Sequence, residues 1–291
     1  MNGILLIDKP QDWTSSDVVA KLRGVLHEKR IGHAGTLDPM ATGLLVLFVG
    51  RATRACSFAE AEDKEYRASL RLGLTTDTQD VTGRVLREAD ASPITEDALR
   101  AALLHFEGEI NQIPPMYSAI KQGGKKLYEI ARRGGEVERQ PRPITVHRIE
   151  LTGRDGEDWL LDICCSKGTY VRTLCHDIGE SLGCGGCMSA LRRVRAGAFS
   201  VENAHTIPEV IAAAAEGRAE SLLLPLDGLF AAFPALTVSA EAERRIRCGN
   251  ETALPDVPDG RWRVYGEGGA FLALSRTEAG VLSTIKSFFE V

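Results

Sequence analysis

The sequence predicts a main domain of class α/β or α+β, followed by a small β-rich appendage. Segments with helical periodicity are interspersed among strand-like segments up to about residue 225. After Pro225-Leu226-Asp227-Gly228 the pattern changes to short strands and glycine-rich turns, as in RVYGEGGAFLALS (263–275). A chain of 291 residues with 44% hydrophobic and 26% charged residues suits one large domain with a small second one.

Period-two alternation and short apolar runs predict the strands. The run from Leu44 to Val49, bounded by Gly43 and Gly50, is typical of a buried strand. In KEYRASLRLG (64–73), alternation places Tyr66 on the apolar face with Ala68, Leu70 and Leu72. The strands expected in the main domain are Gly3–Asp8, Leu44–Val49, Lys64–Gly73, Pro143–Leu151 and Trp159–Cys165.

Capping signals and a 3.6-residue period predict the helices. Thr14 and Asp17 have the spacing of a capping box, and Gly134-Gly135 and Gly183 are helix stops. Between Thr169 and Leu182 the apolar residues fall on one stripe, as in an amphipathic helix. The expected helices are Thr14–Glu28, Thr95–Phe106, Lys125–Arg133 and Thr169–Leu182.

Charge and cysteine content narrow the functional class. The net charge of −5 argues against a uniformly basic nucleic-acid binder, but residues 121–148 hold eight Lys/Arg and three Glu, an excess of +5. A polyanion should therefore meet one face only. We expect a cytoplasmic protein with reduced thiols, because the N-terminus does not resemble a signal peptide and no apolar run is long enough to span a bilayer.

Several common site motifs are absent from the sequence. Cys184 and Cys187 have the spacing of half a zinc site, but no second C-x-x-C or H-x-x-x-H accompanies them. The sequence contains no Walker A loop, no G-x-G-x-x-G and no G-x-S-x-G elbow. We therefore expect no metal, no nucleotide-dependent chemistry and no serine hydrolase.

Asp38, in GHAGTLDPMATGLLVLFVG (32–50), has two interpretations. Asp-Pro is prone to turns, so the carboxylate can simply shape the turn before the buried strand. Alternatively, it is a nucleophile on a loop held by a rigid strand. Arg172 lies near the start of an amphipathic helix, where the helix dipole disfavours a cation. An anionic partner would stabilise it there. An Asp paired with Arg would stay ionised, but the sequence does not prove that Asp38 is that partner.

Read together, several segments closely resemble the bacterial tRNA pseudouridine synthases of the TruB type. The resemblance runs from about residue 3 to 228, and the C-terminal part resembles a PUA domain less specifically. Asp12 departs from the family pattern, which commonly has Gly there, and so does the thiol of Cys187. The matching segments are LLIDKPQDWTSSDVV (5–19), GHAGTLDPMATGLL (32–45), KEYRASLRLGLTTDTQDVTG (64–83), IPPMYSAIKQGGKKLYEIARRGGEV (113–137), RPITV (142–146), SKGTYVRTLCHDIGESLGCG (166–185) and LRRVRAGAF (191–199).

The resemblance implies a fold, an activity and a partner. The implied fold is α+β, with a mixed, mostly antiparallel sheet flanked by helices over residues 1–228 and a PUA-like RNA-binding domain over 233–291. A thumb-like insertion is implied at about 110–145. The implied reaction converts uridine to pseudouridine at position 55 in the T loop of tRNA, without metal or organic cofactor. We expect tRNA as partner, no membrane, no obligate protein partner and a monomer.

The resemblance also implies roles for individual residues. Asp38 matches the nucleophile, Arg172 its partner, and Asp80 an acid at the edge of the site. The residues that match contacts to the everted base are His33, Tyr66, Tyr170 and Leu191. In one scheme Tyr66 also takes a proton. From their charge and position, the candidates for RNA backbone contact are Lys125, Lys126, Arg132, Arg133, Arg192, Arg193 and Arg195.

Two other functions fit the same sequence. The first is a non-enzymatic RNA-folding protein that uses the same groove and would not need Asp38. The second keeps the chemistry but uses a guide RNA within a multi-protein particle. Activity on bare tRNA transcript would separate the guided from the stand-alone enzyme.

Overall fold

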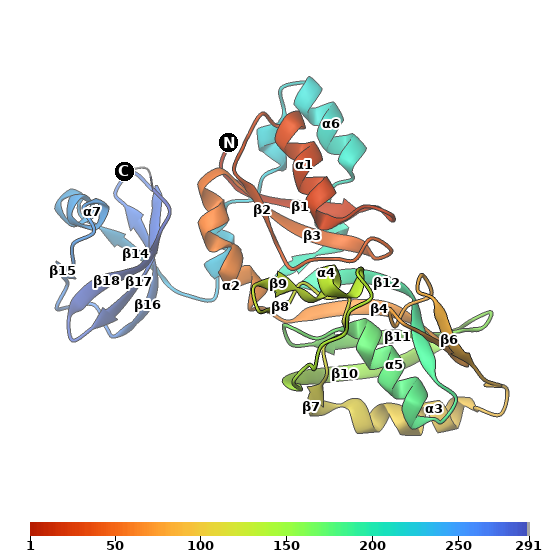
Figure 1. Ribbon diagram of the computed structural model, residues 1–291. Coiled ribbons are helices and arrows are strands. Elements are labelled where there is room, and N and C mark those ends of the chain that lie inside the picture. The colour runs from red at the N-terminus through yellow and green to blue at the C-terminus, as the bar shows by residue number, and fades with distance from the viewer. Residues whose placement is uncertain (290–291) are drawn as a thin grey trace.

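The computed structural model describes residues 1–289 and contains one large sheet and one smaller sheet (Figure 1). The large sheet has nine strands, in the order β1-β3-β12-β4-β11-β10-β7, with β2 and β13 paired at its side. Only β12 and β3 run parallel in it, so the α+β class with a mixed, mostly antiparallel sheet is confirmed. Its strands are β1 (Gly3–Lys9), β2 (Ile31–Ala34), β3 (Thr42–Val49), β4 (Lys64–Leu72), β7 (Gly108–Gln112), β10 (Arg142–Asp155), β11 (Asp158–Cys165), β12 (Gly186–Ala196) and β13 (Phe199–Ser200).

The β1–β3 half of the sheet is covered on both faces. Leu5 and Ile7 pack on one face under α1 (Ser15–Val25) and α6 (Ile207–Ala215). Ile4 and Leu6 point the other way, toward η1 (Gly50–Ala55), α2 (Cys56–Glu60) and η5 (Leu226–Phe230). Because both faces are buried, these strands are apolar at nearly every position and do not alternate.

The other half of the sheet is covered on one face. Ala68, Leu70 and Leu72 of β4 pack with α5 (Val171–Ser181) and α3 (Glu96–Leu103), which is extended by η2 (Leu104–Phe106). The opposite face carries charged residues such as Arg67, which is the alternation expected of a strand buried on one side. A small hairpin of β5 (Leu74–Thr76) and β6 (Val85–Glu88) flanks this half.

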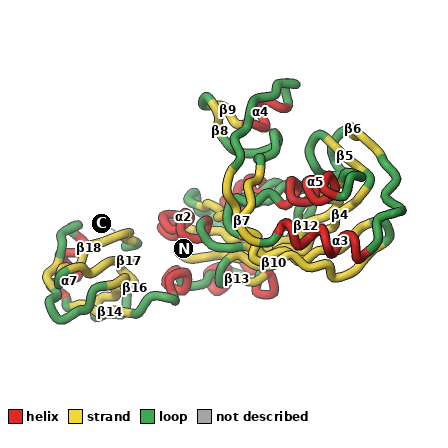
Figure 2. Tube along the Cα trace, turned by 90° about the horizontal axis from the view of Figure 1, so that it is seen from below, coloured by secondary structure: helices red, strands yellow, loops and turns green. Residues whose placement is uncertain are grey.

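Residues between β7 and β10 form an arm that projects from the body of the molecule (Figure 2). It contains β8 (Lys121–Gln122), β9 (Lys125–Lys126) and α4 (Leu127–Ala131). The helix expected from Lys125 to Arg133 is therefore shorter than predicted. Lys125 and Lys126 pair with β8 as a hairpin instead, because Gly123 and Gly124, both with positive φ, turn the chain between the two strands.

The C-terminal sheet has five strands in the order β14-β16-β17-β18-β15, with one helix, α7 (Ala240–Arg247). Phe230 joins it to the main domain: its ring lies 5.3 Å from Phe58, 6.1 Å from Phe271 and 5.7 Å from Phe288. The phenol of Tyr265 also donates to Asp227 Oδ2 at 2.6 Å. The strands are β14 (Ala235–Val238), β15 (Thr252–Ala253), β16 (Gly260–Gly266), β17 (Phe271–Glu278) and β18 (Val281–Ser287), and the remaining short helices are η3 (Val201–Asn203) and η4 (Ala219–Leu222).

Most expected elements are confirmed, with small errors at their ends. The capping box of Thr14 and Asp17 forms, but α1 ends at Val25 and not at Glu28, since His27 takes a positive φ of 50° that a helix cannot continue. The sequence pattern does not predict β2 or β12, although β12 lies in the middle of the large sheet. Within the described part of the chain, no helix combines the length and apolar character of a membrane span.

Candidate active site

Asp38 lies on the loop between β2 and β3, and three other segments hold that loop in place. The Ser15 hydroxyl accepts from the backbone N–H of Leu37 at 2.9 Å. The backbone N–H of Asp12 donates to the carbonyl of Pro39 at 2.8 Å, and the buried Lys9 ammonium donates to the same carbonyl at 3.3 Å. The loop is therefore fixed from the end of β1 and from the start of α1.

Asp38 forms an ion pair with Arg172. Arg172 Nε lies 2.9 Å from Asp38 Oδ2, and Nη1 lies 3.6 Å from Asp80 Oδ2 on the other side. The side chains of Arg172 and Asp80 are 7% and 6% exposed, whereas that of Asp38 is 36% exposed. Of the two acids that share this guanidinium, only Asp38 is open to a ligand.

The rest of the Arg172 guanidinium is also occupied. Nη1 donates to the carbonyl of Thr78 at 3.0 Å and Nη2 to that of Tyr117 at 2.9 Å. Asp80 is held in turn by Thr82, whose backbone N–H donates to its Oδ1 at 3.0 Å. Since a guanidinium has five donors in a rigid fork, this arrangement fixes both the position and the plane of the partner of Asp38.

Burial and charge act in opposite directions on Asp38. Burial raises the pKa of its carboxyl above the ordinary value, and the charge of Asp80 raises it further. Arg172 and Lys9 lower that pKa, without reversing the direction. Burial also lowers the pKa of Lys9 itself to about 8, against the opposing effect of Asp38. A carboxylate that is desolvated and held by one guanidinium is more reactive toward an electrophile than one in water.

Two of the other residues expected at the substrate lie near Asp38. Tyr66 on β4 and Tyr170 before α5 both lie close enough for the Asp38 charge to raise the pKa of their phenols, although burial is the larger cause. Leu191 on β12 pairs with Ala68 of β4 and packs in the same core as Leu37. The Gln112 side chain fixes the backbone of Tyr170 through two hydrogen bonds, of 2.8 and 3.0 Å.

His33 lies on β2, opposite Leu47 of β3. Burial, and secondly the charge of Arg193, lower the pKa of its imidazole. Its Nδ1 is buried without a hydrogen-bond partner among residues 1–289. The ring is therefore a neutral, flat group at neutral pH.

Arg193 does not fit the RNA backbone contact expected from the sequence. It is 1% exposed, and its Nε donates to the carbonyl of Leu44 at 2.7 Å. A buried guanidinium cannot reach a phosphate on the surface. The neighbouring Arg192 points to the other face of β12, where it forms a bidentate pair with Asp8 at 2.8 and 2.9 Å.

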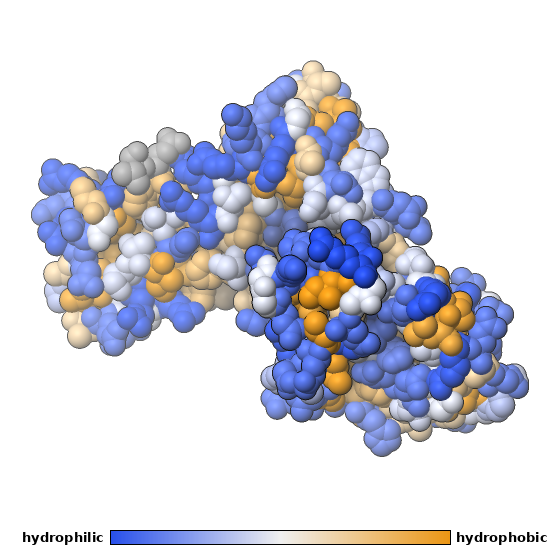
Figure 3. Space-filling view, viewed as in Figure 1, coloured by the Kyte–Doolittle hydropathy of each residue, from blue (hydrophilic) through white to orange (hydrophobic). Residues whose placement is uncertain are grey.

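Arg195, also on β12, is exposed and lies 3.4 Å from Glu65. The four remaining cations expected to contact RNA lie on the arm. Lys125, Arg132 and Arg133 are exposed, and Lys126 and Arg132 each lie 5.3 Å from the centre of the Tyr128 ring. In the space-filling view the surface of the arm is strongly hydrophilic beside a small apolar patch (Figure 3). These residues are distant in sequence from Asp38, but Tyr117 of the same arm binds Arg172 through its carbonyl.

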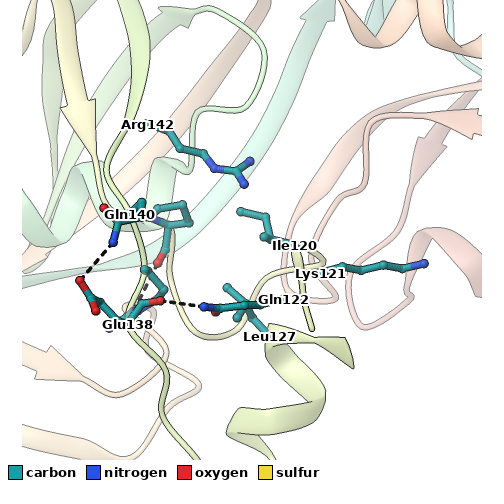
Figure 4. Close-up of a pocket in the computed structure, with 9 residues that line it drawn as sticks. Ile120, Lys121, Gln122, Leu127, Glu138, Gln140 and Arg142 are labelled. Carbon is teal, nitrogen blue, oxygen red and sulfur yellow. Dashed lines mark hydrogen bonds between the residues drawn. The ribbon is translucent and has the colours of Figure 1, made fainter. Parts of the chain in front are cut away.

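A pocket lies where the arm joins the body (Figure 4). Its cavity volume is about 190 Å³, and Ile120 and Arg142 point toward each other across it. Gln122 and Gln140 are tied to Glu138 by hydrogen bonds of 3.3 and 3.1 Å. The pocket is thus lined by cationic and amide groups around a small apolar floor.

The cysteines do not form a reactive site in this structure. Cys184 and Cys187 are both buried, and burial raises the pKa of Cys187 to about 11. All seven thiols are free, and no cluster of three or more His, Cys, Asp or Glu that could hold a metal occurs among residues 1–289.

Sequence reasoning did not identify three residues of this site. Lys9 follows the predicted strand Gly3–Asp8 and no motif implies a role for it, yet its ammonium donates to the carbonyls of Pro10, Trp13 and Pro39. No motif implies a role either for Gln112, which holds the backbone of Tyr170, or for the buried Lys64, whose ammonium donates to the carbonyls of Glu60 and Glu62. A Lys at the end of an apolar strand was the one signal available, because a buried ammonium needs several acceptors.

Comparisons with known proteins identify the family. Residues 23–171 match the model of the TruB family pseudouridylate synthase N-terminal domain, and residues 172–231 match the tRNA pseudouridylate synthase B C-terminal domain. The tRNA pseudouridine synthase B of Aromatoleum aromaticum is 45% identical over 284 residues, which cover 97% of this chain and 91% of that protein. The enzyme of the same name from Clostridium perfringens is 42% identical over 285 residues, 96% of each chain.

Solved structures support the same assignment. A chain of a Cbf5–Nop10–Gar1 complex superposes with a TM-score of 0.75 at 26% identity and covers 99% of this chain and 85% of its own. A chain of an H/ACA RNP bound to a substrate RNA containing 2′-deoxyuridine gives a TM-score of 0.74 at 24% identity, with 99% and 85% coverage, which shows the fold alone. The chain therefore belongs to the TruB family of pseudouridylate synthases, and it is an isomerase.

Proposed function

We propose that this enzyme isomerises uridine 55 in the T loop of tRNA to pseudouridine, with Asp38 as the nucleophile. The observation that carries the assignment is the ion pair of a 36% exposed Asp38 with a 7% exposed Arg172. The Asp38 carboxylate is accessible to a ligand, whereas the Arg172 guanidinium that pairs with it is buried. That geometry keeps the nucleophile oriented and free of competing surface contacts.

The reaction exchanges one glycosidic bond for another. The bond from C1′ to N1 breaks, a bond from C1′ to C5 forms, and a proton leaves C5 while N1 gains one. There is no net oxidation, so a carboxylate and groups that move a proton are sufficient. Asp38 attacks either the sugar or the base; both schemes use the same position of the carboxylate.

The target base lies in a folded loop and has to be everted to reach Asp38. In this proposal the everted base contacts Tyr66, Tyr170 and Leu191. The neutral ring of His33 fills the position that the base leaves among the stacked bases of the T loop. Arg172 and Asp80 orient the nucleophile through the contacts of 2.9 and 3.6 Å. Aromatic and apolar contacts of this kind are typical of sites that bind unstacked bases.

We assign residues 1–228 to catalysis and 233–291 to PUA-like RNA binding. Two facts favour this division: the large sheet ends with β13 at Ser200, and the C-terminal sheet begins with β14 at Ala235. Within the catalytic part, residues 110–145 would contact RNA as a thumb does. The cations that would contact phosphates are Lys125, Lys126, Arg132 and Arg133 of this thumb and the partly exposed Arg192 of β12. We also propose a cytoplasmic enzyme that works as a monomer on tRNA without a protein partner.

The decisive experiment measures tritium release from 5-tritiated uridine in a bare tRNA transcript. Asp38→Asn should abolish release, since the amide is no nucleophile. The matched control is Asp158→Asn, which removes a carboxylate 2.7 Å from Arg71. Asp158 is distant from Asp38 in the sequence and lies on the other face of the sheet. Normal turnover by Asp38→Asn would overturn the assignment. Absence of wild-type turnover on bare transcript would favour a guided enzyme, and RNA annealing that survives Asp38→Asn would reveal an additional RNA-folding activity.

A further inference from the structure

The arm contacts the start of α5 through its root, residues 112–117, at two points. Gln112, the last residue of β7, is 2% exposed. Its Oε1 accepts from the backbone N–H of Tyr170 at 2.8 Å, and its Nε2 donates to the Tyr170 carbonyl at 3.0 Å. At the other end of the root, the carbonyl of Tyr117 accepts from Arg172 Nη2 at 2.9 Å. The arm root therefore extends from the residue that begins α5 to the guanidinium that pairs with Asp38.

Gln112 takes the place of a helix cap. Tyr170 is the N-cap residue of α5, and its own side chain makes no capping hydrogen bond. Its carbonyl accepts from the backbone N–H of Leu174 at 3.0 Å, the first hydrogen bond of the helix, and also from Gln112. Because the first turn of a helix leaves backbone groups without partners inside the helix, a side chain that binds them from outside determines how the chain enters α5.

The arm root is stiff between its two contacts. Pro114 and Pro115 each have a fixed φ, and each restricts the residue before it. The carbonyl of Pro114 also accepts from Arg139 Nη1 at 3.2 Å, which joins the two ends of the arm. A displacement at Gln112 is therefore transmitted along the root to Tyr117.

The arm root is also joined to the part of the arm that carries the cations. The carbonyl of Ser118, the residue after the root, accepts from the backbone N–H of Tyr128 in α4 at 3.1 Å. Helix α4 lies between the lysine pair and the arginine pair that are proposed to contact phosphates. A tRNA bound to these cations would fix α4, and through Ser118 it would fix the arm root against α5.

Resting on the proposed function, we infer that Gln112 is a positioning residue, which holds the start of α5 against the arm root so that Arg172 keeps the orientation in which it pairs with Asp38. Gln112 touches neither the base nor Asp38 in this scheme and acts through Arg172. The arm thereby contributes to the chemical step as well as to RNA binding. A Gln112 that only supported the fold would not change the rate of the folded enzyme.

The test separates the chemical step from tRNA binding. Single-turnover tritium release at saturating tRNA and the Kd for tRNA would be measured for wild type and Gln112→Leu. The variant keeps the cations of the arm, so its Kd should be unchanged. Release should slow roughly ten- to hundredfold, the effect of misplacing a group at the site by about 1 Å. Unchanged release by the folded variant, or a loss confined to the Kd, would overturn the inference.

Asn2→Leu is the matched control. It removes another side-chain amide that accepts from a backbone N–H at the start of a helix, that of Ala52 in η1, at 2.9 Å. Asn2 lies in the half of the sheet that does not contain α5. Release by Asn2→Leu should equal that of wild type, and a loss as large as that of Gln112→Leu would show a general effect on the fold and contradict the inference.

A double-mutant cycle tests whether the effect passes through Arg172. In Arg172→Lys the guanidinium fork is already lost, so Gln112→Leu should add little to the loss of that variant. If the two losses add in full, Gln112 acts by another route, such as the ring of Tyr170, and the inference fails.

The pH profile of Gln112→Leu provides a readout that a change in folding alone would not move. Arg172 is the group that lowers the pKa of Asp38 most. A displaced Arg172 would lower that pKa less, so the acidic limit of the rate should move to higher pH in the variant. A limit at the same pH as in wild type would contradict the inference. The titratable groups that face Asp38 are Arg172, Asp80, Lys9, Tyr66 and Tyr170.

Gln112→Glu keeps the test decisive if Gln112→Leu does not fold. Its neutral acid can accept from and donate to the backbone of Tyr170, whereas its carboxylate can only accept. Release relative to wild type should therefore recover as pH falls, and a ratio that stays constant with pH would refute the inference. A wild-type protein that releases no tritium would instead refute the proposed function, so the two failures are distinguishable.

Discussion

At Asp38 the same carboxylate is desolvated, which disfavours its charge, and paired with Arg172, which favours it. The net result is a pKa raised above the ordinary value. The sequence led us to expect an ionised Asp held by Arg172, and the structure shows the pair but also the burial and the second acid, Asp80. The chemistry therefore depends on how the folded chain balances these effects.

The first prediction is an acidic limit to the rate. Because the nucleophile must be ionised, single-turnover release should fall as pH falls through the raised pKa of Asp38. Lys9 lowers that pKa by its charge, so Lys9→Met should move the limit to higher pH. The measurement is the pH profile of both proteins between about pH 4 and 8, with denaturation followed by circular dichroism. A limit that stays in place in Lys9→Met would show that the ammonium does not act on Asp38.

At the scale of elements, the pairing of β12 with β3 determines where Arg193 and Leu191 lie. Gly43 makes that pairing possible: it has a φ of +96°, and a Cβ there would lie 2.3 Å from the carbonyl oxygen of Arg193. The parallel contact of these strands, Arg193 opposite Gly43, joins the two halves of the large sheet. The site lies at this junction because residues from both halves meet there.

Gly43→Ala should therefore destabilise the protein by about 2–5 kcal/mol, the sum of a left-handed conformation and a backbone clash. Gly156→Ala is the matched control, since its φ is also positive, at +57°, but nothing lies within 4 Å of the added Cβ. It should cost only about 1–2 kcal/mol. Urea denaturation measures both, and equal costs would show that the strand junction tolerates a side chain.

The arm carries the second prediction at this scale. Neutralising Lys125, Lys126, Arg132 and Arg133 should weaken tRNA binding and flatten the dependence of log affinity on log salt, because fewer counterions are released. Neutralising four exposed arginines of other surfaces, Arg30, Arg84, Arg154 and Arg218, serves as the control for net charge. If the salt slope is unchanged in the arm variant, phosphates contact another surface.

At the scale of the whole molecule, the C-terminal domain is packed against the catalytic domain and not merely linked to it. Phe230 is 3% exposed and lies in one cluster with Phe58 of the main domain and Phe288 of the C-terminal sheet. An RNA bound to both domains would then meet surfaces held at a fixed separation.

Phe230→Ala should cost about 3–5 kcal/mol and uncouple the two domains, so that calorimetry shows two transitions in place of one. Leu103→Ala, in the core of the catalytic domain, should lower the melting temperature without splitting the transition. Two transitions already present in the wild type would contradict this account of the domain contact.

The sequence alone determined the local elements and the family. Alternation in 64–73, the capping box at Thr14 and the stripe of the helix from Thr169 are encoded in short windows, and β4, α1 and α5 follow from them. The motifs of the family indicated Asp38 and Arg172.

Only the tertiary structure decided the environment of each residue. In β12, GCMSALRRVRA mixes small and charged residues, so no pattern predicts a central strand with Arg193 buried inside it. Charge contacts such as that of Asp38 with Arg172 join segments more than a hundred residues apart, and a local pattern does not encode them.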